Sequence, residues 1–448
     1  MPGEKPVPEE FEIPYHLANP YLDGAYLLVN AVPDTWLVYN AHDCGYYKAE
    51  KIAGNHDLFS DLLDWKGANR IVRTNLDMAE YVLGSDDRLS KKLLQVVARH
   101  RPASIVVANS NPVVVCGHDT AAVIRDLSAS TGVPMIALPG HKTEQDHVTG
   151  YYDALRGVLE LLRPRGKRRR RKGPVVWIVG YLFGRREGDD LGNVVELRRL
   201  LRGIGARVVE VIPDGSPLRH LRRLAPPDLV VDLSAGECGA VELAECWDAG
   251  YLSTDLPLGI DASERWLRGI AARLGLQQPA EEFIARELAE LLEQLEWITP
   301  RFFAGRSTVV VADRLLLHPL GKFLEELGFL VTAVGCSSGP GSGSSNRGET
   351  AGGWANLPER IGEVRLFLKR AHASGELDVL VANSIICQLV GDLPLVFLEL
   401  GYPANYFHCL RHSPYLGFQG VRVLVERLVN GFGSLSLTWA RTGMEAEK

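Results

Sequence analysis

A short apolar sequence motif occurs three times in the chain, at residues 105–110, 229–234 and 379–384. Each run lacks polar alternation and ends in a small polar residue, which is typical of a parallel strand buried on both faces of a sheet. A cysteine, a short helical stretch and a second apolar run at a proline follow in each case. We interpret this repeat as three copies of one α/β unit.

Further strands and helices are predicted between these runs. The second apolar runs lie at 133–138, 255–259 and 393–398, and other strands are predicted at 35–41, 70–75, 175–180, 206–212, 307–312 and 329–335. Helical spacing predicts helices at 86–98, 151–162, 193–203, 263–274, 280–297, 357–373 and 420–431, and one around Phe323 that ends at Gly328. The start, up to about Tyr26, is rich in proline and acid and predicts an irregular arm, and a short polar tail is expected after the last helix.

The alternation of strands and helices predicts an α/β fold of three Rossmann-like domains with doubly wound parallel sheets. A chain of 448 residues is too long for one core and suits three domains. The expected parts are an N-terminal arm (1–30), domain 1 (31–162), a linker (163–174), domain 2 (175–298) and domain 3 (299–448). Ligands of open parallel sheets collect beyond the carboxyl ends of the strands, so we expect a central cleft between the domains.

The linker carries eight basic residues in its first ten positions. A nucleic-acid or anionic-surface site is one interpretation. A solvated connector is the better one, because prolines and glycines flank the basic run and the whole chain carries a net charge of −6. That charge argues against nucleic-acid binding. The chain has no apolar run long enough to span a membrane and no signal-peptide core, so we expect a cytoplasmic protein.

The seven cysteines form no CxxC pair, so a self-contained zinc site is not expected. Cys44 follows a predicted strand at a turn with His42, Asp43 and Gly45, where backbone groups and a helix N-terminus would stabilise a thiolate. A lone cysteine in such a place is otherwise a small buried residue.

A second loop with polar, metal-competent side chains, residues 109–119, leaves the same predicted sheet. Cys116 and His118 could face the site of Cys44, although Cys116 ends an apolar run and core packing is the better interpretation for it. Cys238 and Cys387 follow the other two repeated strands and could line the cleft between domains.

Three common nucleotide and hydrolase motifs are absent. The segment 180–184 lacks the GxGxxG spacing of a dinucleotide site, and no GxxxxGK[ST] loop for ATP hydrolysis occurs. No GxSxG nucleophile elbow occurs either.

The order of short motifs along the chain resembles the nitrogenase component 1 superfamily. That family includes molybdenum-iron protein subunits, cofactor-assembly scaffolds, dark-operative protochlorophyllide and chlorophyllide reductases and other nitrogenase-like reductases. The resemblance extends from about Tyr39 to Phe432. It rests on residues 39–44 in place of the HGPxGC turn, 73–84 with a threonine-containing strand, 111–119 in place of CPxxLIGDD, 256–267, the helix 320–328 and the PYxGxxG turn at 415–420.

The departures from the family pattern are equally specific. Subunits with a full cluster set have three cysteines in the first domain, and only the middle one, Cys44, stands in place here. Asn111 occupies the position of the third, and the region near Tyr21 has none. The cofactor-holding cysteine of the catalytic nitrogenase subunit would fall close to Asp232, and its cofactor histidine near Leu416. The resemblance thus argues against an iron-molybdenum type cofactor held by those ligands.

The resemblance instead implies a subunit that lends Cys44 to an iron-sulfur cluster shared with a second component 1-type subunit. Such clusters take four ligands, mostly thiolates, so one thiolate requires a partner chain. His42, Asp43 and the Gly45 amide would tune the cluster's potential. The implied assembly is an α₂β₂-type heterotetramer that receives electrons from a separate ATP-hydrolysing iron protein.

The leading hypothesis is therefore a subunit of a nitrogenase-like reductase that relays electrons to a substrate between domains. Asp119, Asp232, His412 and Tyr415 are the candidate residues for lining that cleft. A non-catalytic scaffold for a metallocofactor is an alternative, which the missing cysteines favour. A cluster-free α/β protein that binds a small molecule is a third possibility.

Overall fold

Three parallel sheets dominate the computed structural model of this chain, which describes residue 14 and residues 19–42, 45–63, 69–140, 145–164, 173–338 and 353–446. The first sheet has the order β2 (Ile71–Arg73), β1 (Thr35–Asn40), β3 (Ser104–Asn109) and β4 (Met135–Ala137). The second has the order β6 (Val208–Ile212), β5 (Val175–Val179), β7 (Leu229–Asp232) and β8 (Gly250–Ser253). The third has the order β11 (Ala355–Asn356), β10 (Leu330–Cys336), β9 (Ser307–Ala312), β12 (Val379–Ala382) and β13 (Val396–Glu399).

The predicted fold class is confirmed, because the strand pairs in the described residues are parallel and a helix lies between nearly all successive strands of each sheet. The repeated runs are β3, β7 and β12, and each pairs with the first strand of its own sheet. Backbone groups inside these buried strands are satisfied by neighbouring strands on both sides, which suits their continuous apolar sequences.

One second apolar run is not a strand. Residues 255–259 follow β8 and lead into the next helix, and the carbonyl of Pro257 accepts a hydrogen bond from the Gly417 N–H at 2.7 Å. Pro257 itself has no N–H to give to a ladder. The segment therefore bridges to the C-terminal helix instead of extending the sheet.

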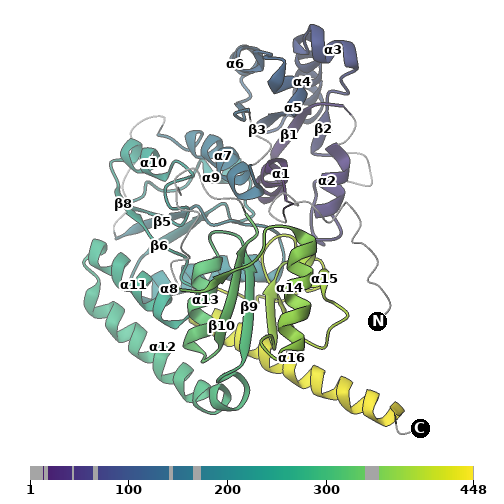
Figure 1. The fold of residues 1–448 in the computed structure, drawn as a ribbon. Helices are drawn as coiled ribbons and strands as arrows, with labels where there is room; N and C mark the ends of the chain where they lie inside the picture. Colours follow the sequence, from purple (N-terminus) through teal and green to yellow (C-terminus); the bar gives the residue numbers. More distant parts are fainter. Residues whose placement is uncertain are drawn as a thin grey trace.

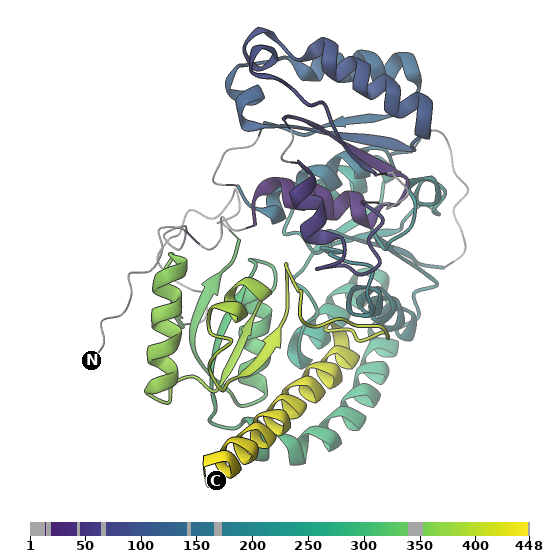
Figure 2. The same ribbon diagram turned by 90° about the vertical axis from the view of Figure 1, so that its right-hand side faces the viewer.

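Helices cover both sides of the sheets (Figures 1 and 2). The N-terminal half contains α1 (Tyr21–Ala31), α2 (Gly45–Ile52), α3 (Met78–Leu83), α4 (Asp86–His100), α5 (Asn111–Val115), α6 (Thr120–Thr131), α7 (His147–Glu160), α8 (Gly188–Gly203) and α9 (Leu218–Leu221). The C-terminal half contains α10 (Ala240–Trp247), α11 (Ile260–Leu274), α12 (Gln277–Ile298), a π-helical turn (Thr299–Phe303), α13 (Leu317–Glu326), α14 (Ile361–Ala373), α15 (Ser384–Leu389) and α16 (Gly417–Ala446).

The expectation of an irregular arm up to about Tyr26 is wrong from Tyr21 onward, where α1 begins. All residues of α1 are buried, and it packs on α7 at a close crossing where Gly24 and Gly150 lie against the backbone of the opposite helix. Burial by a distant helix stabilises α1, although the residues before it are rich in proline and acid.

The last helix is longer than predicted. We expected a helix ending near Gly431, but α16 continues to Ala446. Gly431 packs against the side chain of Val396 on β13, so its small size allows a close approach and does not end the helix. Figure 2 shows α16 running beside α12, with which it is in contact.

Among the described residues, no helix is both long and apolar enough to cross a bilayer. Most of the basic linker (residues 165–172) lies outside the described part of the chain. So does most of a loop rich in glycine and serine, residues 336–353, of which 339–352 are not described.

Candidate functional site

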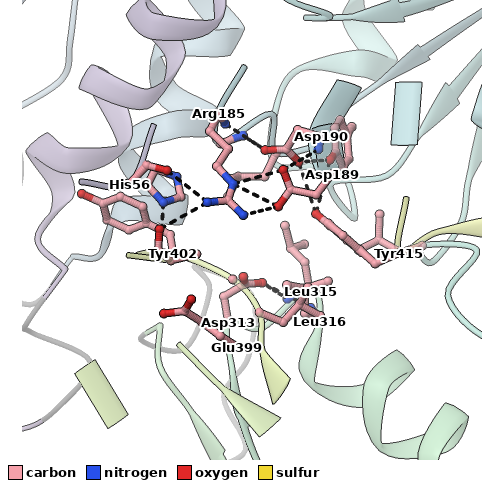
Figure 3. A pocket seen from close by; sticks show the side chains of 17 residues that line it. His56, Arg185, Asp189, Asp190, Asp313, Leu315, Leu316, Glu399, Tyr402 and Tyr415 are labelled. Atoms are coloured by element: carbon pink, nitrogen blue, oxygen red, sulfur yellow. Dashed lines mark hydrogen bonds and ion pairs between the residues drawn. The ribbon is translucent and has the colours of Figure 1, made fainter. Parts of the chain in front are cut away.

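A cavity lies where the ends of β5, β9 and β13 converge (Figure 3). Its volume is about 40 Å³, which is enough for a few water molecules. Polar groups from these strand ends meet leucines from the loops around them. The lining residues are His56, Tyr181, Leu182, Gly184, Arg185, Asp189, Asp190, Leu256, Asp313, Leu315, Leu316, Glu399, Leu400, Gly401, Tyr402, Ala404 and Tyr415.

The side chain of Arg185 joins three parts of the chain at the cavity wall, namely α8, the segment at His56 and the loop 404–407. Its side chain is buried, and the guanidinium binds the Asp189 carboxylate through Nε (3.0 and 3.1 Å) and Nη2 (2.5 Å). Its remaining N–H groups donate to the carbonyls of His56 (3.2 Å), Ala404 (3.3 Å) and Phe407 (3.0 Å). Every side of this cation is thus occupied by the protein, so its charge is already compensated.

Asp190 follows Asp189 on α8 and does not bind the Arg185 guanidinium, but has hydrogen-bond partners of its own. Oδ2 accepts the backbone N–H groups of Gly184 (2.9 Å) and Arg185 (2.8 Å). Oδ1 is hydrogen-bonded with the hydroxyl of Tyr181, which donates when Asp190 is a carboxylate, and lies 3.5 Å from the hydroxyl of Tyr415. Burial, followed by the neighbouring Asp189 carboxylate, raises the pKa of Asp190 to about 7.

His56 is buried and neutral. Burial lowers its pKa well below the usual value, and the charge of Arg185 acts in the same direction. Nδ1 accepts the Ala404 N–H at 3.0 Å, so the ring proton of the neutral form lies on Nε2. Nε2 has no hydrogen-bond partner among the described residues.

Two more carboxylates face the cavity. Asp313, at the end of β9, accepts the N–H groups of Leu315 (2.9 Å) and Leu316 (3.2 Å), and burial raises its pKa. Glu399 accepts three backbone N–H groups of residues 405–407 and the Ser384 hydroxyl, and so holds the loop that carries Ala404.

Of the sequence-predicted cleft residues, Tyr415 lines this cavity. Asp232 is fully buried at the end of β7 and accepts hydrogen bonds from Ser234, Gly236 and Tyr251. His412 is exposed, and neither residue lines the cavity.

The predicted residues on the segment after β3 lie at the carboxyl edge of the first sheet, whereas Cys44 falls outside the described residues. Asn111 is exposed at the start of α5, and Asp119 caps α6 by accepting the Ala122 N–H at 3.2 Å. Both ring nitrogens of His118 are engaged, with the Ser85 hydroxyl (3.1 Å) and the Tyr81 carbonyl (2.9 Å).

The expectation that Cys116 packs in the core is wrong, because the residue is exposed. In the short helix α5 only Val113 faces inward, and the chain at Val115 and Cys116 turns to the surface. Cys238 and Cys387 are buried, but neither lines the cavity.

The described residues do not fit a metal cluster held by this chain alone. They contain no group of three or more His, Cys, Asp or Glu side chains that could bind a metal ion. The described thiols are dispersed, and burial raises the pKa values of Cys238, Cys387 and Cys409, which disfavours the thiolate form that binds metals.

Sequence reasoning missed Asp190, His56 and Arg185. The signal available for two of them was the charged stretch 185–190 just after β5, at a strand end where ligands collect. For His56 no local pattern existed, because its partner Ala404 lies 348 residues away.

The fold and the cavity between its domains define a class, that of three-domain α/β proteins with a central inter-domain site. A solved structure described as "Nitrogenase Cp1 at pH 6.5" has the same fold, with a TM-score of 0.73 and 15% identity over 96% of this chain and 94% of that one. The family described as "Nitrogenase component 1 type Oxidoreductase" matches residues 22–432. The chain belongs to this family, which confirms the resemblance inferred from its motifs.

Curated relatives with different roles are about equally similar. The "Nitrogenase iron-molybdenum cofactor biosynthesis protein NifE" of Klebsiella pneumoniae is 24% identical over 81% of this chain and 79% of its own length. A subunit of the light-independent protochlorophyllide reductase of Methylobacterium radiotolerans is 24% identical over 74% and 62%. The "Nitrogenase molybdenum-iron protein alpha chain" of Methanothermobacter thermautotrophicus is 24% identical over 78% and 72%.

Proposed function

We propose that this chain is a subunit of a nitrogenase-like reductase complex. In this proposal it pairs with a second component 1-type subunit and contributes Cys44 to an iron-sulfur cluster at their interface. A separate ATP-dependent iron protein supplies the electrons, and a substrate between the domains receives them. Family membership supports the oxidoreductase class, and several relatives are named as subunits or as alpha and beta chains.

An exposed apolar surface near His42 supports the proposal that a second subunit binds this chain. Met78, Val82 and Leu83 on α3 are 80%, 74% and 85% exposed, and Val115 at the end of α5 is 84% exposed. We call these four residues the apolar face. Large apolar side chains with such high solvent exposure, at one edge of a sheet, are typical of a surface that another protein covers.

Hydrogen bonds tie this face to the turn that carries the thiol. The N–H of His42, two residues before Cys44, donates to the Tyr81 hydroxyl on α3 at 2.7 Å. His118, which follows α5, bonds the Tyr81 carbonyl and Ser85 in the same part of the chain. A chain that covers the apolar face would therefore also approach His42, two residues before Cys44 in the sequence. A single thiolate needs ligands from elsewhere to hold a cluster.

When bound, a cluster would supply one-electron storage at the interface. The residues of this chain around it would be Cys44 as ligand, with Asn111, Cys116, His118 and Asp119 nearby on the segment after β3. This assignment of ligand and surroundings is part of the proposal.

Leu83→Glu tests the docking surface. A buried, unpaired carboxylate in the covered interface should weaken association with the co-expressed component 1-type subunit of the same organism by about tenfold or more. Affinity purification through a tag on this chain, with quantification of the second subunit, measures the effect.

Leu292→Glu is the matched control, because Leu292 is also an exposed leucine (52%) but belongs to α12, a helix that lies far from α3 (Figure 1). It should bind the partner as the wild type does. Equal retention of the partner by Leu83→Glu and wild type would reject the apolar face as the interface.

A scaffold that assembles a metallocofactor is the second candidate. The similarity to a protein named for iron-molybdenum cofactor biosynthesis favours it, as does the lack of a metal-ligand group among the described residues. Reductant- and ATP-dependent turnover by the purified complex would distinguish the reductase from the scaffold.

A further inference from the structure

The hydrogen bonds around Asp190 determine where its carboxyl can hold a proton. Oδ2 already accepts two backbone N–H groups, those of Gly184 and Arg185. A third hydrogen cannot be placed on that oxygen without losing one of these bonds. The acid hydrogen of a neutral Asp190 must therefore lie on Oδ1, which faces the two tyrosine hydroxyls (Figure 3).

Asn193 determines the direction of the next hydrogen bond. Its Oδ1 accepts the N–H groups of Tyr415 (2.8 Å) and Leu416 (3.0 Å), so its Nδ2 donates to the Tyr181 hydroxyl at 2.8 Å. The Tyr181 hydroxyl oxygen has two lone pairs, and one of them accepts the Asn193 amide hydrogen. The other can accept the acid hydrogen from Oδ1 of a neutral Asp190. The Tyr181 hydrogen then points to the Tyr415 hydroxyl, 3.3 Å away, and Tyr415 lines the cavity.

Burial and the neighbouring Asp189 carboxylate leave Asp190 mostly neutral below about pH 7. Arg185, the nearest cation, is bound to Asp189, and the Asp189 carboxylate itself disfavours a second negative charge. The groups that face the network are Arg185 and Asp189 from the β5–α8 segment, Tyr181 after β5, Tyr415 before α16 and Asp313 after β9. Burial raises the pKa values of both tyrosines well above the usual value, so they remain protonated and can pass a hydrogen on.

The same cavity is lined by a second donor. His56 is 3% exposed, and its Nε2–H makes no hydrogen bond of good geometry among the described residues, although the backbone of Gly184 lies near the ring. Asp313 and Glu399 on the opposite wall disfavour an anion. A molecule that suits this lining is uncharged and presents a lone pair, as a carbonyl oxygen or an imine nitrogen does.

We propose that Asp190, Tyr181 and Tyr415 form a proton-donating relay into the inter-domain cavity, for an uncharged, lone-pair-bearing group of a substrate bound there. The Tyr415 O–H bond breaks as its proton joins the lone pair of the acceptor. The Tyr181 proton moves to Tyr415 and the Asp190 proton moves to Tyr181. Asp190 ends as a carboxylate stabilised by Tyr181 and the two backbone N–H groups, and a proton from water restores it.

This role rests on the proposed function, because a reductase that adds electrons to a substrate also needs protons. The relay itself uses only residues of this chain and can be measured without a cluster or partner. A failed cluster test and a failed relay test are therefore separate results.

Infrared difference spectroscopy of the full chain tests the acid. The wild type should show a protonated-carboxyl band that disappears with a midpoint near pH 7, and Asp190→Asn should lack it. Asp313→Asn is the control for another buried carboxyl of the same cavity and should retain the Asp190 band. A band that persists in Asp190→Asn, or a wild type without any such band, would overturn the assignment.

Transfer to deuterated water tests the route. Tyr415→Phe should retain the carboxyl band but slow its deuterium shift by about tenfold or more, because Tyr181 loses the hydroxyl group to which it passes its proton. Tyr402→Phe removes another buried hydroxyl of the same cavity, one that bonds Asp23, and should exchange as the wild type does. Unchanged exchange in Tyr415→Phe would refute the relay.

The pH dependence of the melting temperature tests the protonation of Asp190 even where Asp190→Asn disturbs packing. The folded-state pKa of Asp190 is raised, so its protonation stabilises the fold, fully below the ordinary value of 3.8 and progressively less as the pH rises to about 7. The melting temperature of the wild type should therefore fall more steeply between about pH 4 and 7 than that of Asp190→Asn. Parallel curves would contradict a neutral Asp190, whatever the absolute stability of the variant.

Discussion

Replacing Arg185 by methionine is expected to destabilise the folded chain by about 3–5 kcal/mol, the range for breaking a buried ion pair from one side. Methionine fills much of the space but leaves the Asp189 carboxylate without its cation. It also leaves the carbonyls of His56, Ala404 and Phe407 without donors. Chemical denaturation of the variant and the wild type measures the loss.

Arg268→Met is the control for removing an arginine that also holds two acidic partners. Arg268 pairs with Glu264 and Glu281 on the exposed surface of α11 and α12. Exposed pairs contribute little, so this variant should unfold almost as the wild type does. If Arg185→Met were as mild as Arg268→Met, the Arg185 network would not hold the three parts together.

Gly24→Ala is expected to destabilise the chain by about 3 kcal/mol or more, at the upper end of the range for overpacking. A Cβ atom at this position would lie 1.8 Å from the His147 carbonyl oxygen and 2.4 Å from the Tyr151 nitrogen. Both obstacles are backbone of α7, so no side-chain rotation can relieve them. Thermal or denaturant unfolding measures the effect.

A helical glycine with space around it provides the comparison. A Cβ atom at Gly433 in α16 would meet nothing within 4 Å, so Gly433→Ala should be neutral or stabilising by up to about 1 kcal/mol, from helix propensity alone. Equal effects of the two substitutions would mean that α1 and α7 do not cross as closely as described.

The sheets were predictable because their signal is local. The runs that became β3, β7 and β12 are continuous and apolar, and burial on both faces demands that composition. The helix α1 was not predictable in the same way, since its stability comes from α7, more than 100 residues later. The start of α8 was missed because its acidic residues are typical of an exposed loop in sequence and are buried only through partners elsewhere.

The site was predictable only in part for the same reason. Tyr415 was found from its turn motif, but its chemistry depends on Tyr181 and Asp190, more than 220 residues earlier. Asp232 is a carboxylate at a strand end, as expected of a site residue. Its oxygens instead accept hydrogen bonds from its own turn and from Tyr251. A sequence pattern can place a polar residue at a strand end, but the distant partners decide whether that residue faces a cavity.

The most direct test of the central claim is the iron and acid-labile sulfide content of the complex purified anaerobically with the second component 1-type subunit. Wild type, Cys44→Ala and the control Cys246→Ala, an exposed thiol on α10, should be compared. We expect iron and sulfide in the wild type and in Cys246→Ala, and their loss or an altered cluster spectrum in Cys44→Ala. Unchanged iron, sulfide and spectrum in Cys44→Ala would contradict a cluster bound through Cys44.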